Sequence, residues 1–148
     1  MTRITFEPLK PEHSRIAAHL RKSDIDEINA LNGLQPSIAV AYSIAASEKG
    51  AAAFIDGELS AVFGIARGVI WLVGTDEINK HPVAFYRTSR RIFRTLCNGY
   101  PKLENYVDAR NIPYLRWLQW LGFDISPPVD AGGVSFHHVV WEARKCAL

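Results

Sequence analysis

Residues 105–125 read NYVDARNIPYLRWLQWLGFDI, and this stretch decides which fold we expect. The valine-centred segment at 103–109 predicts a strand. A helix is predicted over 113–121, because four side chains recur there at helical spacing (i, i+3, i+4, i+7). They are Tyr114, Trp117, Leu118 and Leu121. Asn111 is a common N-cap for this helix.

The sequence before residue 105 alternates between patterns typical of helices and patterns typical of strands. The helix expected over 82–98 lies between VIWLVG at 69–74 and the strand at 103–109, so these two strands must be parallel neighbours joined by a crossover. Asp56-Gly57 between apolar runs predicts an antiparallel hairpin. We expect residues 75–81, TDEINKH, to form a loop. The fold class is therefore α+β, with a mixed, largely antiparallel sheet flanked by helices on both faces.

Length and composition fit a single domain over residues 1–148, with 48% apolar and 22% charged residues. No apolar run approaches the roughly 20 residues of a membrane span. The start MTRITFEPLK lacks the apolar core of a signal peptide, so we expect no membrane association. Cys97 and Cys146 have neither metal-binding nor disulfide spacing, so we expect two reduced thiols and no metal site.

The order of elements over nearly the whole chain, with the pattern N-x(10)-G-F at Asn111, Gly122 and Phe123, resembles the GNAT superfamily of acetyltransferases. More narrowly, WLVGTDEI, an arginine-rich helix and YPKLENYVDARN…LRWLQWLGF resemble a group of small phage-encoded GNAT-like proteins. That group includes internal virion proteins of short-tailed phages. The resemblance implies a GNAT-like fold, a location in the host cytoplasm, and association with the virion as a second location.

In GNAT enzymes the fourth and fifth strands diverge, and the pantetheine arm of acetyl-CoA inserts between them. Those strands correspond here to 69–74 and 103–109. The resemblance implies three cofactor contacts on the first of them: Trp71, Val73 and Gly74. Gly74 also suits a bulge, a close backbone approach or a plain strand end. Asn111 is implied as a ligand of the pantetheine or adenosine part, and it serves equally as a helix cap.

GNAT enzymes hold the cofactor pyrophosphate with a glycine-containing loop that opens the next helix, where backbone N–H groups approach the phosphates. This sequence has TDEINKHP at 75–82 instead, with two carboxylates and no glycine. Arg87 and Arg90 of the following helix are the candidate replacements, because a guanidinium group offers forked donors to phosphate.

Candidate catalytic residues follow from the same resemblance. Many family members place a proton-donating tyrosine seven residues after the asparagine, where this chain has Leu118. Tyr114, one turn earlier, is the candidate donor, although its spacing also fits a core face. Asp76 and Glu77 are the candidate bases for an amine substrate, and two adjacent carboxylates in a loop equally suit a solvated site.

The helix FYRTSRRIFRTL carries a basic stripe at i, i+3, i+4 and i+7: Arg87, Arg90, Arg91 and Arg94. Its apolar arc should pack on the sheet. The stripe suits a solvated face, phosphate binding, or docking to a protein or nucleic-acid partner. Nucleic acid is the weaker partner, because no aromatic stacking platform or nucleic-acid motif accompanies the stripe. Trp120 beside Arg116 suits a protein contact, or it covers the sheet edge.

Two functions from different classes remain. The first is an acetyl-CoA-dependent acyltransferase that acts on an unidentified amine. The second is a non-catalytic GNAT-fold phage protein that acts in virion assembly or ejection, or by binding a host protein. A fold alone does not decide between them.

Overall fold

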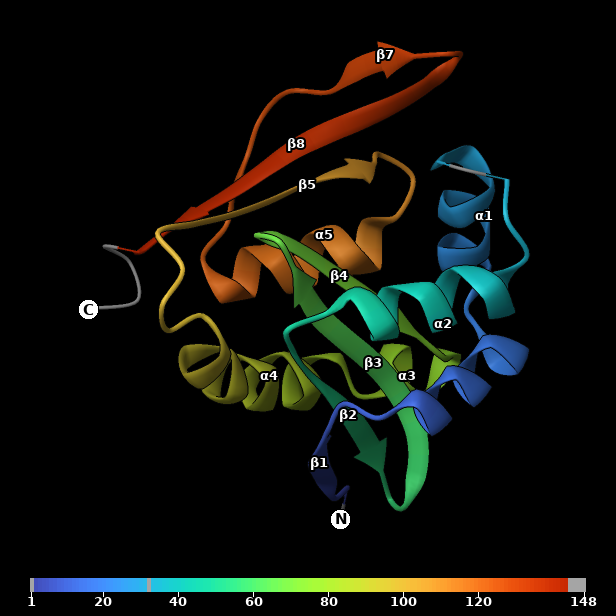
Figure 1. Ribbon diagram of the computed structural model, residues 1–148, viewed down its shortest axis with the longest axis vertical. Coiled ribbons are helices and arrows are strands. Elements are labelled where there is room, and N and C mark those ends of the chain that lie inside the picture. Colours follow the sequence, from blue (N-terminus) through green and yellow to red (C-terminus); the bar gives the residue numbers. More distant parts are fainter. Residues whose placement is uncertain (1, 32, 144–148) are drawn as a thin grey trace.

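The computed structural model describes residues 2–31 and 33–143, so Cys146 lies outside the described residues. The strands are β1 (Ile4–Pro8), β2 (Lys49–Ile55), β3 (Glu58–Ala66), β4 (Val69–Gly74), β5 (Lys102–Asp108), β6 (Asp124–Ile125), β7 (Val129–Ala131) and β8 (Val134–Glu142). The helices are η1 (Pro11–His19), α1 (Lys22–Leu31), α2 (Pro36–Ala46), α3 (Asp76–Lys80), α4 (Pro82–Leu96) and α5 (Ile112–Leu121). Figure 1 shows their arrangement in space.

One eight-stranded sheet runs through the described residues in the order β1-β2-β3-β4-β5-β8-β6, and β7 pairs with β8. β4 and β5 are parallel, and the other pairs are antiparallel. α4 forms the crossover between the two parallel strands, as the sequence predicts. The predicted hairpin is also confirmed, since Asp56 and Gly57 both have positive φ in the two-residue turn between β2 and β3.

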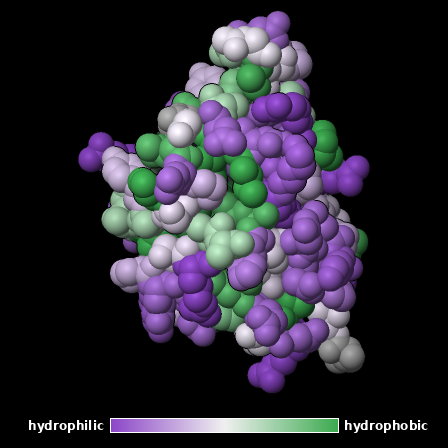
Figure 2. Space-filling view, turned by 90° about the vertical axis from the view of Figure 1, so that its right-hand side faces the viewer, coloured by the Kyte–Doolittle hydropathy of each residue, from purple (hydrophilic) through white to green (hydrophobic). Residues whose placement is uncertain are grey.

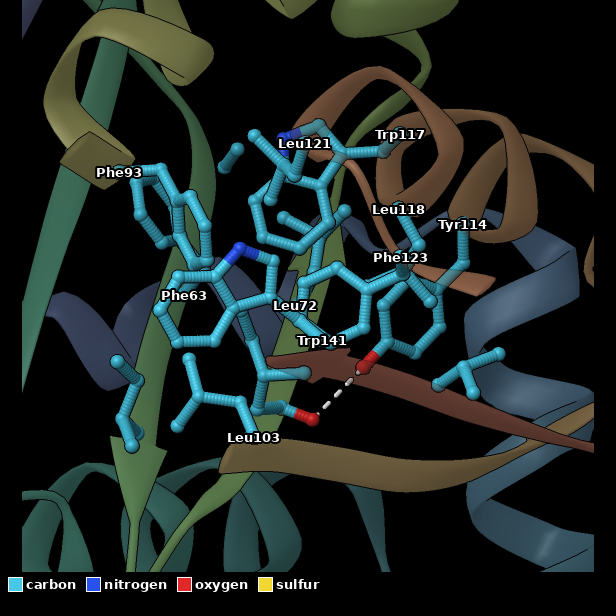
Figure 3. Packing of buried hydrophobic residues seen from close by; sticks show 14 of the residues in the cluster. Phe63, Leu72, Phe93, Leu103, Tyr114, Trp117, Leu118, Leu121, Phe123 and Trp141 are labelled. Atoms are coloured by element: carbon cyan, nitrogen blue, oxygen red, sulfur yellow. Dashed lines mark hydrogen bonds between the residues drawn. The ribbon is translucent and has the colours of Figure 1, made fainter. Parts of the chain in front are cut away.

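Helices cover both faces of the sheet, which confirms the predicted fold class. On one face, α4 and α5 pack an aromatic core that includes Phe63, Phe93, Trp117 and Trp141 (Figure 3). On the other face, η1 and α2 contribute Ile16, Val40 and Ile44 to a smaller aliphatic core. The apolar arc predicted for α4 is confirmed, because Phe85, Ser89 and Phe93 are buried. Cys97, just after α4, is buried in the aromatic core.

One local prediction needs correction. Residues 76–80 form the short helix α3 rather than part of a loop, because the hydroxyl of Thr75 accepts a hydrogen bond from the N–H of Glu77 and caps the helix. The segment after Pro11 is a 3-10 helix, η1. Within the described residues, no helix combines the length and apolar character that a membrane crossing requires. The same residues contain no cluster of three or more His, Cys, Asp or Glu side chains that could hold a metal ion.

β4 and β5 pair only at their beginnings, and this positions the candidate site. Their register has the single pair Val69↔Glu104, and the N–H of Glu104 donates a hydrogen bond to the carbonyl of Gly68. β4 nevertheless pairs with β3 up to Gly74, and β5 pairs with β8 up to Asp108. The two strands therefore diverge toward their carboxyl ends, as Figure 1 shows.

Candidate functional site

The edge of β4 that faces β5 carries the backbone groups of alternate residues. Thr75 bonds to Ser60 of β3, and neighbouring residues in a strand point their N–H and C=O groups to opposite sides. Ile70, Leu72 and Gly74 therefore present their backbone groups to the opening between β4 and β5. Other groups of the protein already form hydrogen bonds to the backbone of Ile70 and of Gly74.

The carbonyl of Ile70 accepts two side-chain hydrogen bonds. The hydroxyl of Tyr114 donates to it at 2.9 Å, the contact drawn as a dashed line in Figure 3. The Nδ2 group of Asn105 donates to it at 2.7 Å, while the Oδ1 atom of Asn105 accepts from the N–H of Tyr106 on β5. Asn105 thus bridges the two strand edges at the point where they part. Tyr114 is buried, and burial raises the pKa of its hydroxyl, which therefore stays protonated.

At the far end of β4, the backbone of Gly74 is bonded to residues at the start of α1. Its N–H donates to Oδ2 of Asp24 at 2.8 Å, and its carbonyl accepts from the N–H of Arg21 at 2.9 Å. The Arg21 guanidinium forms a buried two-point pair with Asp24, at 3.0 and 3.2 Å, and also donates to Asn79. Among the described residues, no group is bonded to the backbone of Leu72 on the edge between Ile70 and Gly74.

Glu27 lies one helical turn after Asp24 and is also buried. The Nδ2 group of Asn111 donates to both carboxylates, at 3.0 Å in each case. The pKa of Glu27 is raised to about 8. Burial is the largest cause and the charges of Asp24 and Asp108 add to it, while the hydrogen bonds from Asn111 and from the Asp108 backbone act in the opposite direction. Arg110 binds Asp108 and lowers the pKa of that carboxyl. Glu27 is therefore poised to exchange a proton near neutral pH.

These groups border one pocket of about 150 Å³ between α1, α2 and the diverging strands. Its polar lining contains Asp24, Glu27, Ser43, Asn105, Asn111 and the phenol of Tyr114. Leu72 of β4 also lines it, so the opening between the strands communicates with the pocket. Figure 2 views the side of the molecule that carries α1 and α2, where hydrophobic side chains interrupt the otherwise hydrophilic surface.

The structure brings together four of the residues predicted from sequence: Trp71, Val73, Asn111 and Tyr114. Trp71 donates its indole N–H to the hydroxyl of Ser47 and so ties β4 to the end of α2. Asn111 caps α5 by accepting from the N–H of Tyr114, which confirms the predicted cap. Tyr114 satisfies both interpretations, since its ring lies in the aromatic core and its hydroxyl reaches the opening.

Gly74, Asp76 and Glu77 do not line this pocket. A Cβ at Gly74 would lie 2.5 Å from Cδ1 of Ile78, so the Ile78 side chain would have to shift to make room for it. Asp76 and Glu77 border a separate hollow with His19 and Glu58, and Glu77 pairs with Lys80 at 2.7 Å. The catalytic role of the two carboxylates stays a prediction, and the structure places them apart from Tyr114.

The arginine stripe lies on the exposed side of α4. Arg87, Arg90, Arg91 and Arg94 are all exposed and do not line the pocket. Trp120 is half-buried rather than exposed, and its ring lies 5.7 Å from that of Tyr86 on α4. Burial raises the pKa of the Tyr86 hydroxyl, against the opposing charges of Arg21 and Arg116. Trp120 thus joins α4 to α5, and the partner role of the stripe stays a prediction.

Sequence reasoning missed three residues of the site: Asp24, Glu27 and Asn105. The signal for two of them was present, because pocket-lining residues of α1 recur at i, i+3, i+4 and i+7. They are Asp24, Glu27, Ile28 and Leu31. Two acids on the buried stripe of a helix indicate a polar site rather than a solvated face. Asn105 carried no such signal, since its role depends on where β4 and β5 part.

Comparisons with known proteins identify the fold. No family model and no curated protein matches the sequence. A GNAT-family acetyltransferase from Streptococcus pneumoniae is 14% identical, with a TM-score of 0.59 over 95% of this chain and 99% of that chain. An aminoglycoside acetyltransferase in complex with coenzyme A is 14% identical, with a TM-score of 0.61 over 96% of each chain. A spermidine N-acetyltransferase chimera from Vibrio cholerae and hSSAT is 11% identical, with a TM-score of 0.65 over 97% of this chain and 98% of that chain. The chain therefore has the fold of GNAT acetyltransferases.

Proposed function

We propose that this protein is an acyltransferase that moves an acyl group from an acyl-CoA, such as acetyl-CoA, to an amine bound in the pocket. One observation carries the proposal: the Leu72 edge of β4 faces the same pocket as the carboxyl of Glu27 and the hydroxyl of Tyr114. A hydrogen-bond donor, a proton acceptor and a proton donor therefore border one small volume. Acyl transfer needs these three groups at its reacting centre.

The residues fit the thioester end of an acyl-CoA better than its phosphates. Bound there, the cofactor would supply an acyl group already activated as a thioester. The N–H of Leu72 is the donor for the acyl carbonyl, and the carboxylate of Asp24 holds the next edge N–H, that of Gly74. No glycine loop precedes α4, so the phosphates require side chains. We assign them to Arg87 and Arg90, together with Arg116 of α5.

The transfer balances with two residues of the chain. The amine reacts in its neutral form, after its ammonium ion has lost one proton to solvent. Its nitrogen bonds to the acyl carbon, and the bond between that carbon and sulfur breaks. The carboxylate of Glu27 accepts the proton that the nitrogen loses. The hydroxyl of Tyr114 turns from the carbonyl of Ile70 and donates its proton to the departing sulfur, while Asn105 keeps its own bond to that carbonyl. We assign the base to Glu27 rather than to Asp76 or Glu77, because those two border a different hollow.

Calorimetric titration of acetyl-CoA and of CoA tests the cofactor part of this proposal. We expect micromolar binding of acetyl-CoA that weakens several-fold in Arg87→Ala. Arg15→Ala is the matched control, since it removes the same charge from η1, on the other face of the sheet. Absence of binding at millimolar acetyl-CoA would refute an acyl-CoA-dependent activity.

One observation favours a second candidate, a non-catalytic protein with this fold. The buried pair of Arg21 and Asp24 already occupies the end of β4 at Gly74. Together with the missing glycine loop, it leaves less of the strand edge for a cofactor. Such a protein would act through the arginine stripe or Trp120, in phage assembly or ejection or on a host protein. Mass spectrometry of purified phage particles, carried out beside the titration, tests whether this protein is packaged in the virion, as its role in assembly or ejection requires.

A further inference from the structure

We infer that the pocket accepts a compact amine with a single positive charge and an apolar body about the size of one aromatic ring. The ammonium group meets the carboxylate of Glu27, and the body lies against the α1 and α2 side chains at the mouth. The transfer step rests on the function proposed above, whereas binding of the amine does not.

Glu27, at the floor of the pocket, lacks the salt bridge that its neighbouring acids have. Two of the three neighbouring acids have buried or bidentate cation partners, since Arg21 pairs with Asp24 and Arg110 pairs with Asp108. Within the described part of the chain, Glu27 forms no salt bridge and is held by Asn111 and by the backbone of Asp108. The Arg110 guanidinium feels the charge of Glu27 but is paired with Asp108. A buried carboxylate without a cation is unfavourable, so Glu27 holds a proton instead, and a ligand ammonium group can replace that proton.

The mouth of the pocket is apolar. Leu31, Leu34 and Tyr42 line it and remain exposed, Tyr42 to 73%. Ile38, also exposed, lies one helical turn before Tyr42 on α2 and extends the same surface. Clustered exposed apolar side chains of this kind mark a binding surface. Among the described residues, the only acids that line the pocket are Asp24 and Glu27, so a second positive charge further along a ligand would meet no carboxylate there.

The volume sets the size of the apolar body. The pocket holds about 150 Å³, and an apolar cavity of about this volume accommodates one benzene molecule. A chain with several amines or a sugar would place further polar groups against Ile28, Leu31 and Leu34, whose side chains offer no hydrogen bond. A phenyl ring on a short alkylamine has the right size, and its single ammonium group reaches the carboxyl floor.

The charged and titratable groups that face Glu27 come from several elements. α1 brings Asp24, with Arg21 just before the helix. β5 brings Asp108 with its partner Arg110. α5 brings Tyr114 and its cap Asn111, whereas α2 and β4 face the pocket with the neutral Ser43 and Trp71 and with the phenol of Tyr42. An ammonium group placed among them stabilises the charged form of Glu27, so binding should expel its proton.

Calorimetry of 2-phenylethylamine at pH 7, in two buffers of different ionisation enthalpy, tests the inference without any acyl-CoA. With a Glu27 pKa of about 8, binding should release about 0.9 proton per amine. Glu27→Gln should abolish the release and weaken binding at least about tenfold. Tyr42→Ala, at the exposed mouth, should weaken binding a few-fold and leave the release intact. Glu12→Gln on η1 is the matched control and should change neither quantity.

Two further ligands complete the design. Spermidine keeps the amine of the proposed ligand without the ring, and 2-phenylethanol keeps the ring without the amine. Both should bind at least about tenfold more weakly than 2-phenylethylamine. Equal or tighter binding of spermidine, release that survives Glu27→Gln, or no amine binding at millimolar concentration would each overturn the inference. Such a failure is separate from a failure of acetyl-CoA to bind, because the two titrations share no ligand.

Discussion

Asp24 at the start of α1 accepts a hydrogen bond of 2.8 Å from the backbone N–H of Gly74, fifty residues later at the end of β4. The other oxygen of the same carboxylate accepts from Asn111, the cap of α5. One buried side chain therefore holds a helix, a strand end and a second helix together around the pocket. This junction positions Glu27, one turn further along α1, beside the opening between β4 and β5.

Removal of the Asp24 carboxylate should be strongly destabilising. Asp24→Ala leaves the Arg21 guanidinium buried without its partner and leaves the N–H of Gly74 without an acceptor. We expect a loss of about 3–5 kcal/mol in the free energy of unfolding, measured by urea denaturation. Asp26→Ala is the control, because Asp26 pairs with the exposed Lys22 and should cost less than about 1 kcal/mol. Similar losses in the two variants would contradict the role of Asp24 as a junction.

Glu27→Gln should change how stability depends on pH. The folded protein raises the pKa of Glu27 from 4.5 to about 8, so between these values the folded state binds more protons than the unfolded state. Stability of the wild type therefore falls as pH rises through this window, by up to about 5 kcal/mol in total. A glutamine side chain cannot ionise, so the variant should lack this decline. Its free energy of unfolding should therefore rise relative to that of the wild type between pH 5 and pH 8. Parallel curves of unfolding free energy against pH for the two proteins would show that Glu27 is not perturbed.

Tyr114→Phe separates the two roles of this residue. The ring still fills the aromatic core, and the carbonyl of Ile70 keeps its bond from Asn105, so the loss of stability should be about 1 kcal/mol. If the hydroxyl protonates the leaving sulfur, kcat for acyl transfer should fall about 10²-fold with little change in KM. Steady-state kinetics measures both quantities, and an unchanged kcat would remove Tyr114 from the chemistry.

Phosphate binding by side chains predicts a strong dependence of acetyl-CoA affinity on salt. Arg116→Ala should weaken acetyl-CoA about three- to tenfold at low ionic strength, with a smaller effect at about 0.5 M salt. The same variant should bind 2-phenylethylamine normally, because Arg116 does not line the pocket. Equal loss of both ligands would indicate a general disturbance of α5 instead.

Most of the fold could be predicted from local patterns, because they coincide with strong backbone preferences. The Asp56-Gly57 turn predicts the hairpin, and the apolar spacing of the two segments predicts α4 and α5. The parallel pairing of β4 with β5 followed from the helix between them. α3 was missed because its cap, Thr75, was interpreted as part of a loop.

The site was less predictable, because it depends on the point at which β4 and β5 stop pairing and diverge. Asp24 meets Gly74 and Asn111 only after the sheet has formed, across separations of 50 and 87 residues. The i, i+3, i+4, i+7 spacing of Asp24 and Glu27 with Ile28 and Leu31 was visible in the sequence, but the two acids were not considered as site residues. The bridge made by Asn105 has no local signature.

Hydrogen exchange at the backbone amide of Leu72, followed by NMR with and without acetyl-CoA, tests the central claim most directly. If the acyl-CoA lies along the open edge of β4, its carbonyl accepts from this N–H, and exchange at Leu72 should slow at least about tenfold on binding. The amide of Gly74, already bonded to Asp24, should change little. Exchange at Leu72 that stays unchanged under saturating acetyl-CoA would contradict the proposal that this opening is the acyl-transfer site.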